Sequence, residues 1–247
     1  MIPWMLLDTA RVPESRDELC LKQHGDEFMI TVENEELMSS RHHDSEEALA
    51  RVACGRFEGR KGCRVLIGGL GMGYTLSAAL GRLPADARVV VAELVPKVVE
   101  WNRGALAHLA GRPLEDPRVT VFEGDVAEVL KAEPRGFDAV VLDVDNGPEG
   151  FTRKKNDWLY ARPGLATTHA ALRPEGVLAV WSAGPDAPFL RRVRQVGFDV
   201  EELRVPASRR RGGHRHTIWL AWRRGTGRCS PGRPIGRSRS TCATRWR

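Results

Sequence analysis

The chain has 247 residues, of which 42% are hydrophobic and 28% are charged, a composition typical of a globular protein with one α/β core. It contains no apolar run near the ~20 residues that a membrane-spanning helix needs, and we expect no signal peptide because its beginning lacks a basic segment. Its five cysteines form no CxxC pair, which argues against a disulfide framework and a bound metal and favours the cytoplasm.

The formal net charge of +6 is unevenly distributed along the chain. Residues 205–247 hold 12 arginines and no acidic residue, which leaves 26 basic residues against all 32 acids in the rest. An acidic body does not favour nucleic acid, so we expect neither a nucleic-acid nor a membrane partner. Residues 224–247 are rich in Gly, Ser, Pro and Arg without an apolar period, and we predict a disordered tail there.

Residues 1–60 are expected to form a small N-terminal segment. Residues 18–23 and 27–33 flank a His-Gly-Asp turn, which predicts a β-hairpin. A helix is expected to begin at Ser45, a candidate N-cap, with Glu46 and Glu47 at the positive end of the helix dipole. We interpret this segment as a lid or a dimer contact.

Residues 61–223 read as strands that alternate with helices, which predicts a doubly wound parallel sheet with right-handed crossovers. From their apolar patterns we expect seven strands, at residues 63–67, 88–92, 119–122, 137–142, 176–181, 198–205 and 217–222. The expected helices span residues 73–83, 96–109, 126–132, 165–172 and 189–196. No helix separates the last two strands, so we expect them to pair antiparallel. This Rossmann-like α/β arrangement resembles the fold of class I S-adenosylmethionine-dependent methyltransferases.

A glycine-rich loop follows the first of these strands. Gly69, Gly71 and Gly73 form a G-x-G-x-G sequence between a strand and a helix. Glycines there permit a tight turn and let a ligand approach the backbone, and the N–H groups that begin a helix favour a carboxylate or phosphate. The loop therefore predicts a ligand site, although glycines also serve simple turns.

Two acidic residues end the next two strands. Glu93 can accept hydrogen bonds from both ribose hydroxyls of a nucleoside. Asp125 follows the third strand, where a carboxylate can bind the exocyclic amine of an adenine, and it is also placed to cap the helix at 126–132. Ligands bind at the carboxyl ends of the strands in such sheets, so the loop and the two acids together favour an S-adenosyl nucleoside over a dinucleotide.

The fourth strand ends at Asp143. A partly desolvated carboxylate at the centre of the expected cleft can orient an amine nucleophile and accept its proton. Asp145 and Asn146 could hold a second polar end of the acceptor, although an Asx turn around Asn-Gly-Pro explains them equally well.

Four segments together resemble spermidine synthase and its relatives, the polyamine aminopropyltransferases: VLIGGLGMGYTL, VAELVPKVVEWNR, DPRVTVFEGDVAEVL and FDAVVLDVDNGPEG. The resemblance covers about residues 18–200. It implies aminopropyl transfer from decarboxylated S-adenosylmethionine to a small-molecule amine, with Glu93 and Asp125 binding this co-substrate and Asp143 as the catalytic carboxylate. It also implies a homodimer through the N-terminal hairpin and no permanently bound cofactor.

The sequence departs from that family at the acceptor and donor motifs. Gly71 and Met72 stand where the family's loop has an aspartate for the donor's amine, and the segment SSRHHDSEEAL lacks the family's tyrosine. Two alternatives therefore stay open. One is methyl transfer from S-adenosylmethionine, because a loop of amides suits a donor that retains its carboxylate. The other is a nucleoside-binding protein without catalysis.

Overall fold

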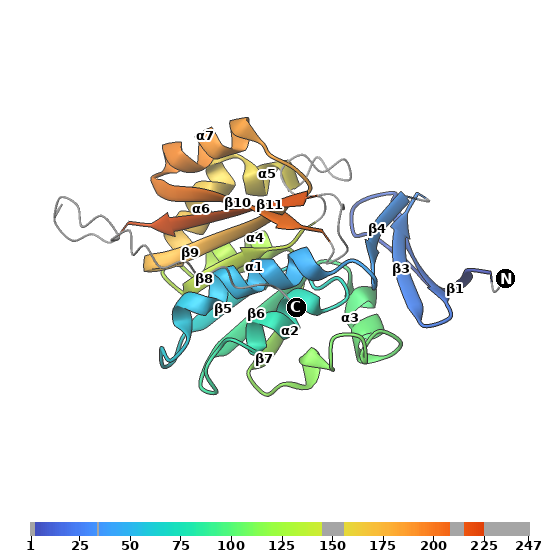
Figure 1. Ribbon diagram of the computed structural model, residues 1–247. Helices are drawn as coiled ribbons and strands as arrows, with labels where there is room; N and C mark the ends of the chain where they lie inside the picture. Colours follow the sequence, from blue (N-terminus) through green and yellow to red (C-terminus); the bar gives the residue numbers. More distant parts are fainter. Residues whose placement is uncertain (1–2, 34, 145–155, 208–214, 225–247) are drawn as a thin grey trace, which may run out of the picture.

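The computed structural model describes residues 3–33, 35–144, 156–207 and 215–224. A large mixed sheet forms the body of the protein, and a small antiparallel sheet from the N-terminal part of the chain stands beside it (Figure 1). No helix in these residues is long and apolar enough to cross a membrane. The predicted tail lies outside the described residues, apart from Arg224.

The large sheet confirms the predicted fold class. Its seven strands lie in the order β10-β11-β9-β8-β5-β6-β7, and β5 to β9 run parallel while β11 pairs antiparallel with both β9 and β10. The strands are β5 (Arg64–Gly68), β6 (Arg88–Glu93), β7 (Val119–Glu123), β8 (Phe137–Leu142), β9 (Leu172–Ser182), β10 (Phe198–Pro206) and β11 (Arg215–Arg223).

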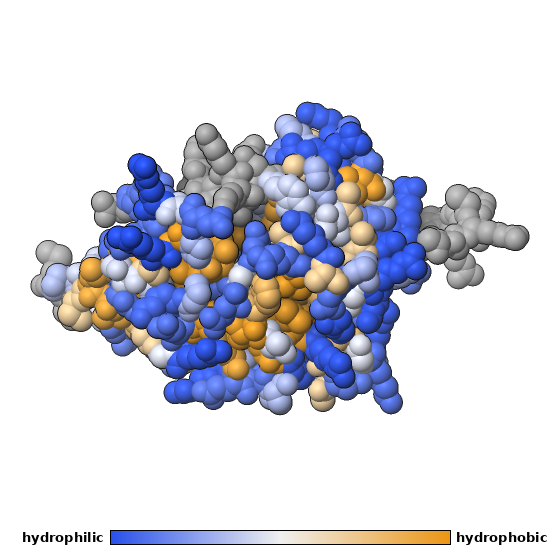
Figure 2. Space-filling view, turned by 180° about the vertical axis from the view of Figure 1, so that it is seen from behind, coloured by the Kyte–Doolittle hydropathy of each residue, from blue (hydrophilic) through white to orange (hydrophobic). Residues whose placement is uncertain are grey.

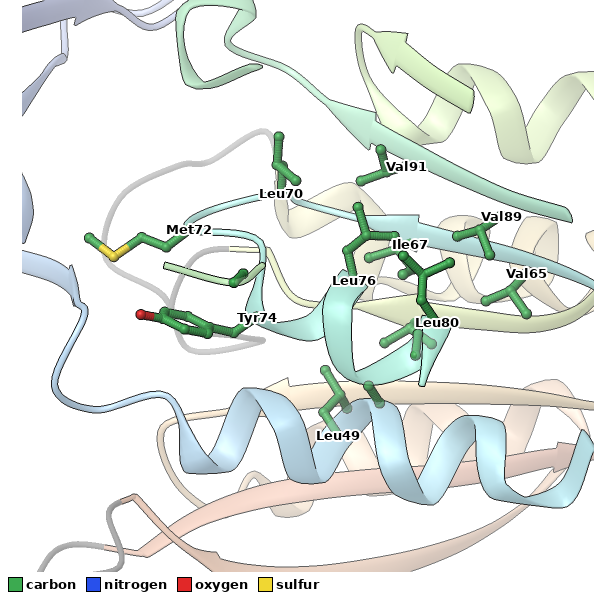
Figure 3. Packing of buried hydrophobic residues seen from close by; sticks show 14 of the residues in the cluster. Leu49, Val65, Ile67, Leu70, Met72, Tyr74, Leu76, Leu80, Val89 and Val91 are labelled. Carbon is green, nitrogen blue, oxygen red and sulfur yellow. The ribbon is translucent and has the colours of Figure 1, made fainter. Parts of the chain in front are cut away.

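Helices cover both faces of this sheet. They are α1 (Asp44–Cys54), α2 (Tyr74–Leu80), α3 (Pro96–Arg103), α4 (Val126–Ala132), α5 (Asn156–Tyr160), α6 (Arg162–Ala171) and α7 (Ala187–Val196). Side chains of α1 and α2 join one hydrophobic cluster, in which Leu49, Ile67 and Leu76 point toward one another (Figure 3). Side chains of α4, α6 and α7 join a second cluster on the opposite face. The sheet therefore separates two cores.

Strand β8 is apolar apart from Asp138 near its start, a buried acid that forms ion pairs with Arg60 and Arg173. Successive side chains of a strand point to opposite faces, so Ala139 and Val141 enter the first cluster while Val140 and Leu142 enter the second. All six residues of the strand are buried. Full burial of an aliphatic side chain contributes about 1.5–3 kcal/mol, and a strand in the middle of a covered parallel sheet has no solvated face for polar residues.

The N-terminal sheet is larger than the predicted hairpin. The hairpin is present as β2 (Glu18–His24) and β3 (Glu27–Val32), and the strands β1 (Met5–Arg11) and β4 (Glu35–Ser39) add to its two sides. Strand β1 was not predicted because its apolar residues do not alternate with polar ones; Met5 and Leu6 are exposed. This outer end of the sheet is at the left in Figure 2, where hydrophobic residues are visible at the surface.

One polar contact fixes the small sheet beside the large one. Asp8 of β1 accepts a hydrogen bond of 2.9 Å from the indole N–H of Trp101 in α3, and Lys97 of the same helix lies 3.3 Å from its carboxylate. The indole hydrogen bond lowers the pKa of Asp8 from its usual value. The buried side chains Leu19, Ile30 and Val32 belong to the same hydrophobic cluster as the large sheet, so apolar packing holds the inner face of the small sheet against the end of the large sheet.

Two local predictions were wrong. The helix expected over residues 96–109 ends at Arg103, because Gly104 leaves the helical conformation and the residues after it form turns. Ser45 does not cap α1, whose N-cap position is His43 without a side-chain cap. Ser45 is buried in the first turn, where its hydroxyl lies 3.1 Å from the Trp181 indole nitrogen and 2.9 Å from Nδ1 of His216.

Candidate functional site

A pocket of about 910 Å³, its open mouth included, lies between the two sheets. One wall is the inner face of the small sheet, with the side chains of Val12, Leu19, Ile30, Val32, Leu37 and Met38. The other wall consists of the ends of β5, β6, β7 and β8, and it includes the predicted site residues Gly69, Gly71, Glu93, Asp125 and Asp143.

The glycine loop between β5 and α2 is shaped by close contacts that exclude side chains. Gly69 has φ +88°, and a Cβ there would overlap the carbonyl oxygen of Asp143. A Cβ on Gly71 would meet the sulfur of Met38 at 3.0 Å, so the small sheet closes directly over the loop. Gly73 does not line the pocket; it supports the loop from behind, with φ +85° and its N–H bonded to the carbonyl of Leu70 at 2.8 Å.

Glu93 connects two turns that border the pocket. One carboxylate oxygen accepts a hydrogen bond from the N–H of Leu70 in the glycine loop. The other accepts one from the N–H of Val95 just before α3. Both donor–acceptor distances are 2.9 Å. Glu93 is only 8% exposed. A carboxylate accepts up to about four hydrogen bonds, so Glu93 can also accept hydrogen bonds from the hydroxyl groups of a ligand in the pocket.

Asp125 serves as the N-cap of α4, the structural role that its sequence position also suggested. Its Oδ1 accepts the N–H of Ala127 at 2.8 Å. The residue lines the pocket as well. The cap fixes the orientation of this carboxylate, so the two roles are compatible.

Asp143 lies where β8 ends, beside the glycine loop. Its N–H donates to the carbonyl of Gly68 at 2.9 Å, and its carboxylate accepts a hydrogen bond from the hydroxyl of Thr75. Burial raises the pKa of Asp143 to about 6, against the opposing effect of the Thr75 hydrogen bond. A carboxylate with this pKa is mostly ionised at neutral pH and is a better proton acceptor than an exposed aspartate.

Glu46 is a second carboxylate of this region that sequence analysis did not assign to the site. It lies in the first turn of α1, and the Thr75 hydroxyl oxygen that bonds Asp143 is 3.4 Å from the backbone carbonyl of Glu46. Burial, and next the negative charge of Asp143, raise the pKa of Glu46 well above its usual range. An acid in the first turn of a helix is ordinary, so nothing in the sequence distinguished Glu46 from Glu47.

The remaining predicted site residues, Asp145 and Asn146, lie outside the described residues. Within the described ranges, no group of three or more His, Cys, Asp or Glu side chains is arranged to hold a metal ion. The described polar groups of the pocket are therefore carboxylates and backbone amides, which suit a ligand with hydroxyl, amine and ammonium groups.

Comparison with known proteins gives one family. Residues 45–193 match the family model described as the spermine/spermidine synthase domain. Putrescine N-methyltransferase 4 of Nicotiana tabacum is 36% identical over 116 residues, which are 47% of this chain and 28% of that protein. Polyamine aminopropyltransferase 2 of Pseudomonas aeruginosa is 32% identical over 152 residues, which are 57% of this chain and 41% of that protein. The chain thus spans less than half the length of these relatives.

Solved structures share the fold. The spermidine synthase of Thermotoga maritima superimposes with a TM-score of 0.70 at 18% identity, covering 88% of this chain and 72% of that one. A spermidine synthase in complex with the transition state analogue AdoDATO gives a TM-score of 0.69 with the same identity and coverage. A probable spermidine synthase from Corynebacterium glutamicum gives 0.61 at 15% identity, covering 89% of this chain and 80% of that one.

The contact between Gly69 and Asp143 can be tested with Gly69→Ala. The new methyl group needs both a strained positive φ and the space that the Asp143 carbonyl occupies, so the loop and the end of β8 must separate. The control is Gly59→Ala, which has φ +78° but an open surrounding and costs only the backbone strain of about 1–2 kcal/mol. We expect a clearly larger loss of unfolding free energy for Gly69→Ala in chemical denaturation; equal losses would contradict the close contact.

The raised pKa of Asp143 makes stability depend on pH. Its folded-state pKa of about 6 exceeds the ordinary aspartate value of 3.8, so the native state binds the proton more tightly, and stability falls as pH rises between these values. Asp143→Asn removes this penalty. We expect the variant to be more stable than the wild type at neutral pH, by up to about 3 kcal/mol, and the gain to shrink toward pH 4. Thermal unfolding across this range measures it, and a gain that is independent of pH would contradict the buried carboxylate.

Proposed function

Because the chain belongs to the spermine/spermidine synthase family, we propose that it is a transferase that moves an aminopropyl group from decarboxylated S-adenosylmethionine to a small-molecule amine. The observation that carries this proposal is that Glu93, Asp125 and Asp143 all line one pocket. The chain covers only part of its curated relatives, so donor, acceptor, the predicted cytoplasmic location and the predicted homodimer all stand as proposals.

Each of the three carboxylates has a distinct role in the proposed donor complex. Glu93 accepts hydrogen bonds from the ribose hydroxyls, in addition to those from the two backbone amides that already orient it. Asp125, fixed by its capping bond, accepts the exocyclic amine of adenine. With the nucleoside placed this way, the donor's sulfonium lies toward the end of β8, close to Asp143.

The chemical step is a displacement at the carbon bound to the sulfonium. The amine nitrogen forms a bond to that carbon, the carbon–sulfur bond breaks, and its electron pair stays on the sulfur of the leaving thioether. The protein must align the amine and keep it unprotonated. Asp143 orients the amine and accepts its proton, and its pKa of about 6 suits a base that acts near neutral pH.

Methyl transfer from intact S-adenosylmethionine is the second candidate function. It is supported by the glycine loop, in which Leu70 and Met72 are buried apolar side chains and no acid is available for the donor's amine. Backbone amides in such a loop suit the carboxylate that the intact donor keeps. The similarity to a protein named putrescine N-methyltransferase supports the same alternative.

Calorimetric titration of the purified protein with the two donors separates these functions. We expect tighter binding of decarboxylated S-adenosylmethionine, because the Asp143 region favours a cation over a carboxylate. Tighter binding of the intact donor would favour methyl transfer. Binding of neither donor would contradict the nucleoside site, and binding without turnover of any amine would favour the nucleoside-binding protein without catalysis.

The role of Asp143 is tested by the variant Asp143→Asn. An amide keeps the size and one acceptor oxygen but cannot take a proton at neutral pH, so we expect transfer to putrescine to fall by about a hundredfold or more. Donor affinity should stay within about twofold, because Glu93 and Asp125 carry the nucleoside. Product formation followed by chromatography measures the rate, and undiminished turnover would contradict the assignment.

A further inference from the structure

Thr75 differs from the other helical threonines in where its hydroxyl bonds. Thr167 and Thr168 of α6 show the usual arrangement, in which the hydroxyl donates to the carbonyl four residues earlier in the same helix. Thr75 lies in the first turn of α2, directly after the glycine loop, and is 2% exposed. Its hydroxyl donates instead to the carboxylate of Asp143 at the end of β8. The side chain therefore connects α2 to the site.

The Thr75 hydroxyl has one proton and two acceptors within reach. One acceptor is Oδ2 of Asp143, and the other is the backbone carbonyl of Glu46 in α1, whose oxygen is 3.4 Å from the hydroxyl oxygen. A hydrogen bond to an ionised acceptor is about twice as strong as one to a neutral acceptor. The proton therefore points to Asp143 as long as this carboxylate is ionised, and the longer contact with Glu46 is the weaker alternative.

The bond from Thr75 occupies only one of the two carboxylate oxygens. The backbone of Asp143 is fixed independently, since its N–H donates to the carbonyl of Gly68 and its own carbonyl closes over Gly69. Within the described parts of the chain, Oδ1 has no hydrogen-bond partner, and Asp143 lines the pocket. With Oδ2 held toward α2, Oδ1 is the oxygen that is available to a ligand.

The charged groups around Asp143 are acidic. Asp17, Glu93 and Asp125 line the same pocket, and no Lys, Arg or His is among the described residues that line it. From α1, Glu46 feels the charge of Asp143, because burial and then this charge raise the pKa of Glu46. Burial likewise raises the pKa of Asp143, and the Thr75 hydrogen bond lowers it. Thr75 thus favours the ionised form of Asp143 where its surroundings disfavour it.

We propose that Thr75 is the positioning residue of Asp143, which holds Oδ2 and keeps the carboxylate ionised so that Oδ1 accepts the proton of the amine. This inference rests on the proposed function and adds a residue that acts through Asp143 without contacting the substrate. In the step, the amine nitrogen bonds to the carbon, the electron pair of the carbon–sulfur bond stays on sulfur, and the N–H proton passes to Oδ1. Asp143 becomes a neutral acid, and Oδ2 can still accept from Thr75.

Thr75→Val tests this role without depending on turnover, because it replaces the hydroxyl by a methyl group of similar size. Carbon-13 NMR of the full chain labelled at the aspartate carboxyl groups follows the titration of Asp143, whose signal is identified by its absence from Asp143→Asn. The pKa of Asp143 is about 6 in the wild type. We expect it to rise by about one to two pH units in Thr75→Val, since the ionised form loses its hydrogen bond. Thr75→Ala should act alike, and Thr75→Ser should restore the wild-type titration.

The pH dependence of transfer to putrescine gives the catalytic readout. A higher pKa of Asp143 moves the acidic limb of kcat/KM to higher pH, so we expect Thr75→Val to be about tenfold slower than the wild type at pH 6. The difference should shrink toward about pH 9, where Asp143 is ionised in both proteins. Thr168→Val is the matched control, because it removes an equally buried helical hydroxyl that bonds only within α6. It should follow the wild type at every pH.

The failures of the two proposals are distinguishable. If the wild type transfers no aminopropyl group, the proposed function is wrong, and the role of Thr75 in it falls as well. If the wild type is active but Asp143 titrates in Thr75→Val as it does in the wild type, the role of Thr75 is wrong while the proposed function stands. A loss of rate in Thr75→Val that is equal at all pH values would also overturn this role, because structural damage alone produces it.

Discussion

The close approach of the glycine loop to the end of β8 is the constraint on which the site depends. Strands β5 and β8 pair in parallel at the centre of the sheet, and the Asp143 N–H extends this pairing by one bond to Gly68. Only a residue without a side chain can then occupy position 69. This contact brings together the loop proposed to bind the donor and the carboxylate proposed to accept the proton, although Gly69 and Asp143 are 74 positions apart in the sequence.

The carboxylates of the site differ in exposure, because Glu93 is buried, Asp143 is half-buried and Asp125 is exposed. Glu93 is stabilised by two amides and Asp125 by one, whereas Asp143 has a hydroxyl. The carboxylates with amide partners border the expected nucleoside, which is bound through neutral groups. Asp143 borders the expected sulfonium, and a bound cation there offsets the cost of burying its charge. At neutral pH the free protein is therefore less stable than the same fold with Asp143 neutralised.

Much of the large sheet could be predicted because its signals are local. The apolar run of β8 and the α4 sequence after Asp125 predicted both elements with their observed bounds, and five predicted site residues line one pocket because parallel strands end at one edge. Glu46 was missed because its environment is made by α2 and β8, which are distant in sequence. Ser45 was misassigned for the same reason. Its hydroxyl forms hydrogen bonds with Trp181 and His216, which are distant in sequence, instead of the capping bond that its residue type favours.

The pocket's two walls also have a consequence for how the protein acquires its activity. Met38 and the other side chains of the small sheet come from the first 40 residues, while Asp143 comes more than a hundred residues later. Contacts of such large sequence separation form late, because the intervening chain must lose its entropy first. During synthesis, the residues of the first wall are made before the strands that complete the pocket. The proposed nucleoside affinity then belongs to the finished molecule alone, and such a ligand would distinguish a fully assembled chain from a partly folded one.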